Sequence, residues 1–465
     1  MTTQTPELAR RAQEGRTIGS LPRRIWRSAF PQPLAANSDR DRAQLTRFTF
    51  LLHLRPVRLP ASTLRWTHTF GLGGSSLVLF SVLAATGILM MLHYHPSPDT
   101  AWRSVWQLER EVSFGALVRG VHWWSANLLI VVLLAHTARV FLTGGYHGPR
   151  KFNWVIGCCL LASVLAAAFT GYLLPWDQLA YWAVTISTGM LEYVPLVGEP
   201  VQRVLRGGEA IGAATLVTFF TLHTTVVPVL LIGLMGFHFW RVRRAGGVVD
   251  PRPSEDGEDG DGPEKVLFLP NLLVREVSQA LVVVAVVVVL GAVVGAPLGE
   301  AANPGMSPNP AKAPWYFMGF QELLIHLHPL FAIVVVPLLA GAGLILLPYL
   351  TPDDEPAGPW FLSRRGRRAA AIAAGAAMIA TPLAVVLDDL GTASRGWIAA
   401  GVVPLAVVVA ATLALAFGLR RRLGTTAGET VQAVVVLLAV AFAVLTVVGV
   451  WFRGEGMALT WPWNT

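Results

Sequence analysis

Two stretches of the chain decide its fold: RGVHWWSANLLIVVLLAHTARV at residues 119–140 and TLHTTVVPVLLIGLMGFHFWRVRR at residues 221–244. Each is long and apolar enough to cross the hydrocarbon core of a bilayer as a helix. Each also carries two histidines at nearly the same interval, 14 residues between His122 and His136 and 15 residues between His223 and His238. At 3.6 residues per turn, the two histidines of one helix lie on roughly one face, about 21 Å apart along the axis.

An imidazole inside hydrocarbon is costly and usually functional. A single such histidine is often a hydrogen-bond donor between helices, but two pairs at matched spacing are hard to explain in that way. Two facing helices would present two His/His couples, and each couple could bind the iron of a planar macrocycle from both sides. With both axial positions filled, the iron has no open site for oxygen. The pattern therefore predicts a transmembrane electron-transfer protein with two hemes.

Four glycines repeat the same interval, because Gly73 and Gly87 are 14 residues apart and so are Gly157 and Gly171. Glycine in a helix interior costs about 0.8–1 kcal/mol relative to alanine, so its presence needs a reason. Small residues let another group approach the backbone closely. Ordinary packing between membrane helices would explain one pair. The interval shared with the histidines indicates two macrocycle edges resting at two depths.

The composition is that of a polytopic membrane protein. Hydrophobic residues make up 54% of the chain and charged residues 14%, and the mean hydropathy is +0.54. The formal charge of +8 comes from arginines near helix ends, which indicates membrane topology and gives no sign of nucleic-acid binding. The two cysteines, Cys158 and Cys159, are adjacent, a spacing that suits neither a metal site nor a disulfide framework.

Nine apolar runs predict an all-α polytopic membrane protein with about nine transmembrane helices. They lie at residues 72–93, 120–142, 153–174, 211–239, 279–297, 330–350, 369–387, 397–418 and 430–451. Residues 1–66 are rich in arginine and lack the apolar region of a signal peptide. We therefore expect a cytoplasmic N-terminus and a C-terminus outside, in the plasma membrane of a bacterium.

The runs and their connections predict five parts of the chain. These are a basic N-terminal segment 1–66, a four-helix diheme bundle 67–244, an acidic Gly/Pro-rich linker 245–266, a second membrane domain 267–350 and additional membrane helices 351–465. A stretch as polar and Gly-rich as the linker favours a flexible, solvated connection.

The segments around the histidines resemble cytochrome b of the quinol-oxidising cytochrome bc complexes. The stretches that carry the resemblance are RGVHWW, HTARVFLTGGYHGPRKFNW, TGYLLPWDQLAYWAV, TLHTTVVPVL and GFHFWRVRR. The first half is most similar to cytochrome b6, and residues 267–350 resemble subunit IV, the quinol-site polypeptide, fused into one chain. The resemblance covers about residues 60–350 and offers no function for the helices of 351–465.

The resemblance implies two non-covalent b hemes. The outer, low-potential heme would lie between His122 and His223, and the inner, high-potential heme between His136 and His238. Arg119 and Arg139 match family arginines close to the hemes, where a guanidinium can pair with a propionate. An ordinary positive-inside anchor is the alternative for both, and it suits Arg139 better than Arg119.

Further matches imply two quinone sites. The residues that match the outer quinol-oxidation site are Tyr172, Pro175, Trp176, Asp177, Trp315 and Tyr316. Arg243 matches a basic residue near the inner quinone site, although an arginine that sets topology is an equal alternative.

Two positions depart from the family pattern. Pro314 stands where the family usually has the glutamate of Pro-Glu-Trp-Tyr, and proline cannot accept a quinol proton. Glu322 is the candidate replacement, with His326 and His328 as relays, unless Glu322 simply belongs to a solvated helix face. Gly71 stands where cytochrome b6 has the cysteine that binds an extra heme, so no covalent heme c is expected.

The function implied by the resemblance is a Q cycle. Quinol from the membrane pool would give one electron to a Rieske iron–sulfur protein and the other through the two hemes to an inner quinone, with proton translocation. The chain has no Cys/His cluster pattern and no CxxCH heme site, so a Rieske protein and a c-type cytochrome must be partners, in a complex expected to be a homodimer. The alternatives are a diheme quinone-reactive anchor of another oxidoreductase, without bifurcation, and a polytopic transporter. The quinone type and the final electron acceptor stay open.

Overall fold

The computed structural model describes residues 38–49, 55–251, 264–351, 357–391 and 396–464, with Pro22, Leu52 and Glu355. Most of the predicted N-terminal segment and the middle of the predicted linker lie outside these residues. Within the described ranges, nine helices are long and apolar enough to cross a membrane. The predicted nearly all-α membrane fold is confirmed.

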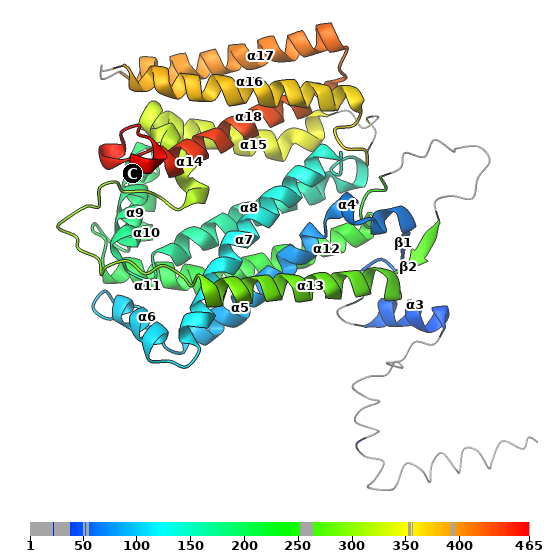
Figure 1. Ribbon diagram of the computed structural model, residues 1–465, viewed down its shortest axis with the longest axis horizontal. Helices are drawn as coiled ribbons and strands as arrows, with labels where there is room; N and C mark the ends of the chain where they lie inside the picture. Colours follow the sequence, from blue (N-terminus) through cyan, green and yellow to red (C-terminus); the bar gives the residue numbers. More distant parts are fainter. Residues whose placement is uncertain are drawn as a thin grey trace, which may run out of the picture.

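The membrane-crossing helices run side by side along the long axis of the molecule (Figure 1). They are α5 (Leu72–Met91), α7 (Gly115–Leu142), α8 (Lys151–Tyr172), α11 (Ala213–Thr221) continued by α12 (Val227–Arg244), α13 (Phe268–Val293), α15 (Val336–Leu350), α16 (Arg364–Asp389), α17 (Val403–Leu423) and α18 (Ala427–Trp451).

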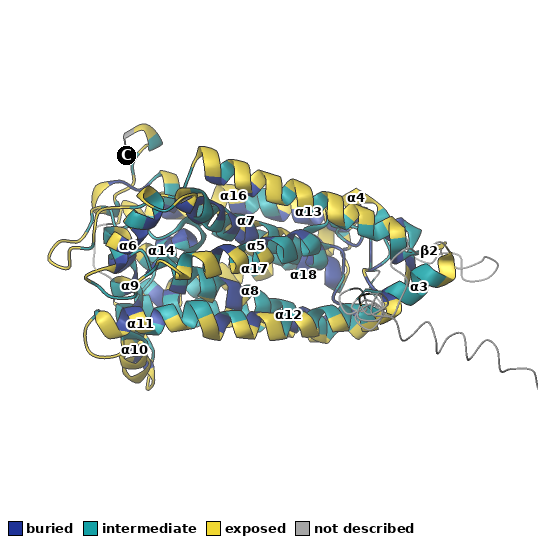
Figure 2. Ribbon diagram, turned by 90° about the horizontal axis from the view of Figure 1, so that it is seen from below, coloured by how far each residue is buried: buried dark blue, intermediate teal, exposed yellow. Residues whose placement is uncertain are grey.

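The first core forms where α5 packs on α7, α8 packs on α12, and α13 covers α5 and α7. Aliphatic side chains from these helices form one buried cluster, which includes Leu79, Leu129, Val164, Leu231 and Val287. The outward faces of the helices are exposed (Figure 2). Many of their exposed side chains are large and hydrophobic, as expected for helices whose solvent is lipid.

The C-terminal helices form a second layer above this bundle (Figure 1). α16 packs along α18 through small residues such as Ala369, Ala373 and Ala433. α18 in turn packs on the short helix α14 (Trp315–His326), where Gly319 meets Phe442. The segment 351–465 is thus attached to the rest mainly through α14 and α18.

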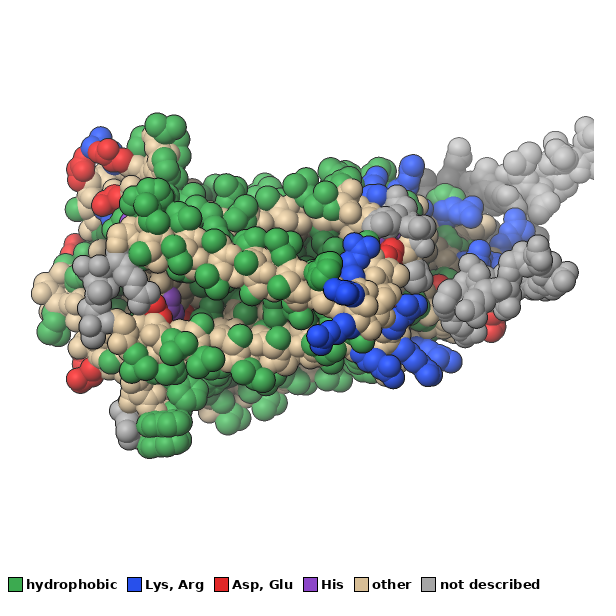
Figure 3. Space-filling view, turned by 90° about the horizontal axis from the view of Figure 1, so that it is seen from above, with side chains coloured by type: hydrophobic (Ala, Val, Ile, Leu, Met, Phe, Trp, Pro, Cys, Tyr) green, Lys and Arg blue, Asp and Glu red, His purple; other side chains and the backbone are tan. Residues whose placement is uncertain are grey.

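The two ends of the bundle differ in structure and charge. One end carries α3 (Asp39–Phe48), α4 (Trp66–Thr69) and an antiparallel pair of strands, β1 (Arg58–Pro60) and β2 (Lys265–Leu267). Basic side chains gather at this end (Figure 3), which we call the basic end. The opposite end carries the short helices α6 (Ala101–Arg110), α9 (Gln178–Gly189), α10 (Gly198–Arg206) and α14.

Three helices widen into a π-helical turn just before a proline. These turns are Leu222–Val226, Phe331–Val335 and Ile398–Val402, and the prolines are Pro228, Pro337 and Pro404. Proline lacks the N–H for the regular helical bond and clashes with the carbonyl four residues earlier, and a wider turn relieves both problems. His223 lies within the first of these turns.

Candidate functional site

The first histidine pair, His122 on α7 and His223 before α12, faces across the bundle with ring centres 6.3 Å apart. A ligating imidazole nitrogen lies about 2 Å from its metal, so two rings on opposite sides of one metal have centres about 6 Å apart. The observed separation fits an iron held between the two rings.

The Nδ1 atoms of both histidines already form hydrogen bonds with protein groups. Thr86 Oγ1 donates to the carbonyl of Val82 at 2.7 Å, so its contact with His122 Nδ1 at 2.9 Å requires the imidazole to donate. His223 Nδ1 donates to the carbonyl of Ala167 at 2.9 Å. With both protons on Nδ1, both Nε2 lone pairs are free for a metal.

The second histidine pair, His136 and His238, lines a cavity of about 260 Å³ nearer the basic end. Gly73 and Gly157 line the same cavity, so its walls come from four different helices. No group of three or more His, Cys, Asp or Glu side chains in the described ranges is arranged to hold a metal. Two axial histidines are what a heme requires, since the macrocycle supplies the other iron ligands.

Each of the four predicted glycines packs against one of the four histidines. A Cβ added at each would point at an imidazole Cε1 atom, at 3.5 Å for Gly73 and His136, 3.4 Å for Gly87 and His122, and 3.7 Å for Gly157 and His238, with overlap for Gly171 and His223. The glycine and histidine intervals agree because the two sets are packed together. The contact with macrocycle edges stays a prediction.

The two predicted arginines are buried and paired with protein groups. Arg119 forms an ion pair with Glu109 and donates to the carbonyl of Ala296 at 3.1 Å. Arg139 donates to the carbonyl of His68 at 2.9 Å, and burial together with Arg139 lowers the pKa of His68. Neither arginine is an exposed anchor. Arg243 lies in the last turn of α12 and is not among the residues that line the second-pair cavity.

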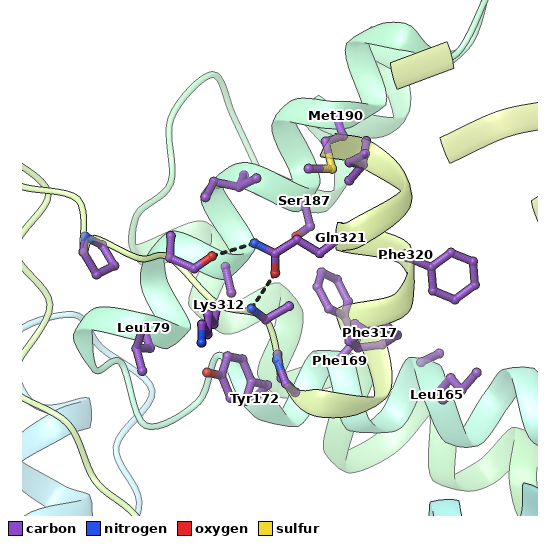
Figure 4. Close-up of a pocket in the computed structure, with 18 residues that line it drawn as sticks. Leu165, Phe169, Tyr172, Leu179, Ser187, Met190, Lys312, Phe317, Phe320 and Gln321 are labelled. Carbon is purple, nitrogen blue, oxygen red and sulfur yellow. Dashed lines mark hydrogen bonds between the residues drawn. The ribbon is translucent and has the colours of Figure 1, made fainter. Parts of the chain in front are cut away.

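A larger cavity of about 400 Å³ lies at the end opposite the basic end, between α8, α9, α14 and the loop that precedes α14 (Figure 4). We call it the α9–α14 cavity. Its walls are mainly apolar, with polar side chains from Tyr172, Ser187, Lys312 and Gln321. Tyr172 is adjacent to Gly171, which packs on His223, so this cavity adjoins the first histidine pair.

Of the residues predicted for the quinol site, Tyr172 lines the α9–α14 cavity. Pro314, which stands where the family usually has a glutamate, lines it too. The others, Pro175, Trp176, Asp177, Trp315, Tyr316 and Glu322, are not among its lining residues. Asp177 caps α9 through the N–H of Ala180 at 2.9 Å and accepts from the N–H of Gly299 at 3.1 Å.

Trp315 does not line the cavity but helps to hold α14, which forms one of its walls. Its indole Nε1 donates to Asn127 Oδ1 at 2.7 Å, and its ring lies against Tyr316. Burial raises the pKa of Tyr316 above the ordinary tyrosine value. These contacts tie the first turn of α14 to α7, and so fix one wall of the cavity.

Glu322 is fully buried on the face of α14 opposite the cavity, so the idea that it belongs to a solvated helix face is wrong. Arg453 Nε lies 3.1 and 3.2 Å from its two carboxylate oxygens, and His326 Nε2 lies 3.1 Å away. Burial opposes ionisation, but the hydrogen bonds from His326 and Arg453 outweigh it and lower the pKa of Glu322.

The ion cluster continues into α16. His326 Nδ1 lies 2.8 Å from Asp388 Oδ2, and Arg453 NH1 donates to Asp389 at 2.7 Å. Burial works against a charged imidazole, but the bonds to Glu322 and Asp388 raise the pKa of His326. His328 lies elsewhere, beside Tyr193, with its backbone N–H on the carbonyl of Ala400. Proton acceptance by Glu322, with His326 or His328 as relays, stays a prediction.

Several residues at these sites were not foreseen. Thr86 and Thr170 each precede a predicted glycine and lie beside an imidazole Nδ1, so the repeated Thr-Gly dipeptide was the available signal. Lys312 is a charged residue in the apolar stretch KAPWYF, which marks it in the sequence. Arg453 had no local signal, because its partner Glu322 is 131 residues away.

A side chain at Gly71, the position expected to lack a covalent heme, would be strained and would meet the end of the Gln279 side chain. Gly71 has φ +59°, and a Cβ there would overlap the amide of Gln279, whose Nε2 donates to the Gly71 carbonyl at 3.0 Å. A cysteine at this position would require the backbone and Gln279 to move. The absence of a covalent heme c stays a prediction.

Comparisons with known proteins follow this geometry. The family model Cytochrome b/b6/petB matches residues 58–246, which hold all four histidines. Cytochrome b6 from Synechococcus sp. (strain JA-3-3Ab) is 44% identical over 175 residues, covering 38% of this chain and 81% of the relative. Cytochrome b6 from Prochlorococcus marinus (strain NATL1A) is also 44% identical, over 38% of this chain and 80% of the relative.

The chain belongs to the cytochrome b/b6 family. Membership in this cytochrome b/b6 family implies that the chain binds heme b, and the predicted resemblance is confirmed. A solved chain titled "Hyperthermophilic respiratory Complex III" matches with a TM-score of 0.62 at 21% identity, over 87% of this chain and 95% of that one. At that identity the likeness shows a shared fold. Residues 1–350 make up less than 87% of the chain, so the matched region must include part of the segment 351–465. The fold shared with that solved chain therefore extends into the C-terminal helices.

Proposed function

We propose that the chain is the cytochrome b subunit of a bc-type quinol oxidoreductase. It would oxidise quinol in the α9–α14 cavity, reduce a quinone at the basic end and translocate protons across the membrane. The observation that carries the proposal is the first histidine pair, whose ring separation of 6.3 Å and engaged Nδ1 atoms suit a bis-histidine iron.

The proposed ligands are His122 with His223 for a low-potential heme and His136 with His238 for a high-potential heme. Bound heme b supplies reversible one-electron chemistry, and two such groups at two depths would let an electron cross the bilayer. Arg139 lies three residues from His136 and lines the same cavity, so its buried charge favours a negative group near that heme position. Arg119 lies three residues from His122, but its charge is already paired with Glu109. Arg243 remains a candidate at the inner quinone site.

The residues of the α9–α14 cavity would bind and orient quinol. Phe169, Phe317 and Phe320 supply apolar surface for a ring and a lipid tail, while Tyr172 brings a hydroxyl to the wall nearest the first histidine pair. Asp177 and Trp315 hold the wall elements α9 and α14 in place. Oxidation of quinol to quinone releases two electrons and two protons. A heme takes up one electron at a time, so a bifurcating site needs a second one-electron acceptor in addition to heme.

That acceptor must come from a partner. The two cysteines, Cys158 and Cys159, are adjacent in α8, and neither an iron–sulfur nor a CxxCH pattern occurs in the chain. We propose a Rieske iron–sulfur protein as the first acceptor and a c-type cytochrome or equivalent after it, in a dimeric complex that draws on the membrane quinone pool. The final acceptor and the quinone type are not specified by these residues.

The charge distribution supports an orientation in a bacterial plasma membrane. Basic side chains gather at the basic end (Figure 3), which the positive-inside rule assigns to the cytoplasm. The helices α9 and α14 and the described C-terminal residues lie toward the opposite end (Figure 1), so the cavity between these helices would face outside. The segments 67–244 and 267–350 would act as the diheme and quinol-site domains, joined by the linker 245–266.

Bifurcation is the test of this function. Membranes that hold the complex are given quinol, with the inner quinone site blocked, and an oxidant is then added while heme b absorption is followed. Bifurcation predicts that the oxidant increases heme b reduction, because removal of one quinol electron forces the other onto heme. Heme b that only becomes oxidised would support a diheme anchor without bifurcation and overturn the proposal.

A further inference from the structure

Lys312 places a positive charge in the wall of the α9–α14 cavity. It lies in the loop before α14 and lines the cavity with Tyr172 and Gln321 (Figure 4). Its Nζ donates to the carbonyl of Val450 at 3.1 Å, in the last turn of α18. The partial negative charge at a helix C-terminus stabilises a cation there. An ammonium carries three protons, so two remain for another acceptor.

Lys312 is the group of the cavity best suited to pair with a negatively charged ligand. Gln321 Nε2 donates to the carbonyl of Ala311 at 2.7 Å, and Gln321 Oε1 accepts from the N–H of Ala313 at 2.7 Å. Among the described lining residues, Lys312 is the only charged side chain, and none of them is an Asp or Glu. The electrostatic character of this mainly apolar cavity is therefore set by one positive charge.

We infer that Lys312 binds quinol in the α9–α14 cavity as its singly deprotonated anion. This inference rests on the proposed function of the cavity as a quinone site. Quinol would pass one hydroxyl proton to water, and the quinolate oxygen that remains would pair with the Lys312 ammonium, which keeps its own protons. An anion here also counters the partial burial that lowers the pKa of Lys312.

This role differs from that of the carboxylate expected at Pro314. A carboxylate would accept the quinol proton, whereas Lys312 would favour loss of the proton by stabilising the anion. A charge of opposite sign within contact distance stabilises the ionised form of an acid. Lys312 is half-buried, so water screens part of its charge, and we expect about a tenfold preference for the anion.

The experiment compares two ligands of nearly the same shape. 2-Hydroxy-1,4-naphthoquinone is an anion at neutral pH, and its 2-methoxy ether is neutral. Dissociation constants of both are measured by calorimetry on the purified complex, for wild type, Lys312→Gln and Lys312→Arg. An unchanged heme b spectrum reports whether each variant has folded.

The expected result is that Lys312→Gln binds the anion about tenfold more weakly while the methoxy ether binds as before, and that Lys312→Arg retains the wild-type preference. Equal effects on both ligands, or no effect on either, would overturn the role of Lys312 and leave the quinone site intact. If neither ligand binds wild type, the cavity is not a quinone site, and the proposed function fails with the inference.

Discussion

A methyl group at position 171 is expected to disturb one heme and spare the other. In Gly171→Ala, the new Cβ would overlap His223 Cε1 and lie 2.8 Å from His223 Nδ1. Atoms in ordinary contact are about 3.5–4.0 Å apart, so the ring must move by roughly 1 Å. The ring has little freedom, because its Nδ1 is bonded to the carbonyl of Ala167 at 2.9 Å.

The matched control is Gly157→Ala at the second histidine pair. There the added Cβ would lie 3.7 Å from His238 Cε1, which is ordinary contact. Both substitutions carry the same gain in helix propensity of up to about 1 kcal/mol. The difference between them is therefore the overpacking at 171, which costs about 1–3 kcal/mol and falls directly on a proposed iron ligand.

The assay is a redox titration of membranes followed in the heme b absorption band. Gly171→Ala should lose the low-potential component or shift its midpoint, while the high-potential component stays. Gly157→Ala should keep both components near their wild-type midpoints. If the two variants behave alike, or if Gly171→Ala keeps both components unchanged, the packing of glycines against iron-ligating histidines is refuted.

Three further predictions concern the ion cluster and the first histidine pair. Arg453→Met leaves Glu322 buried without its main partner, which should cost about 3–5 kcal/mol in a thermal-unfolding assay; an effect below 1 kcal/mol would show that the contact is dispensable. The pKa of Glu322 is lowered and that of His326 is raised, so the cluster should stabilise the fold most between about pH 4.5 and 6.5, the ordinary pKa values of the two groups. Stability should fall as pH drops through the lowered Glu322 pKa and again as pH rises through the raised His326 pKa, and a Tm profile without either limb would contradict it. Thr86→Val removes the acceptor of the His122 Nδ1 proton and should weaken retention of the low-potential heme by about 10–100-fold. The Thr170 hydroxyl lies 3.5 Å from His223 Nδ1, so Thr170→Val should weaken heme retention less. Equal heme retention in the two variants would argue against a His122 tautomer set by Thr86.

The membrane helices and the histidine pairing were predictable because both depend on local periodicity. Hydropathy runs indicate each helix separately. The match between intervals of 14 and 15 residues then indicated that α7 and α12 face each other, and the first pair meets across 101 positions with ring centres 6.3 Å apart. A pattern repeated on two helices thus carried long-range information.

The surroundings of the α9–α14 cavity were harder to predict because they depend on contacts distant in sequence. Glu322 was a candidate because it lies on the amphipathic stretch FQELLIHLH. Only the packing of α14 against α18 reveals that it pairs with Arg453 on the far face of α14. Lys312 is bonded to Val450, 138 residues away. No periodicity relates such positions, so their pairing follows only from the assembled fold.

The most direct test of the central claim is a potentiometric redox titration of the membrane-bound protein, wild type against His136→Ala. The account predicts two non-covalent b-type components of separate midpoint potential in wild type, with the higher one lost in the variant. Absence of b-type absorption in wild type, or two components that survive His136→Ala unchanged, would contradict a pair of hemes held by His122 with His223 and His136 with His238.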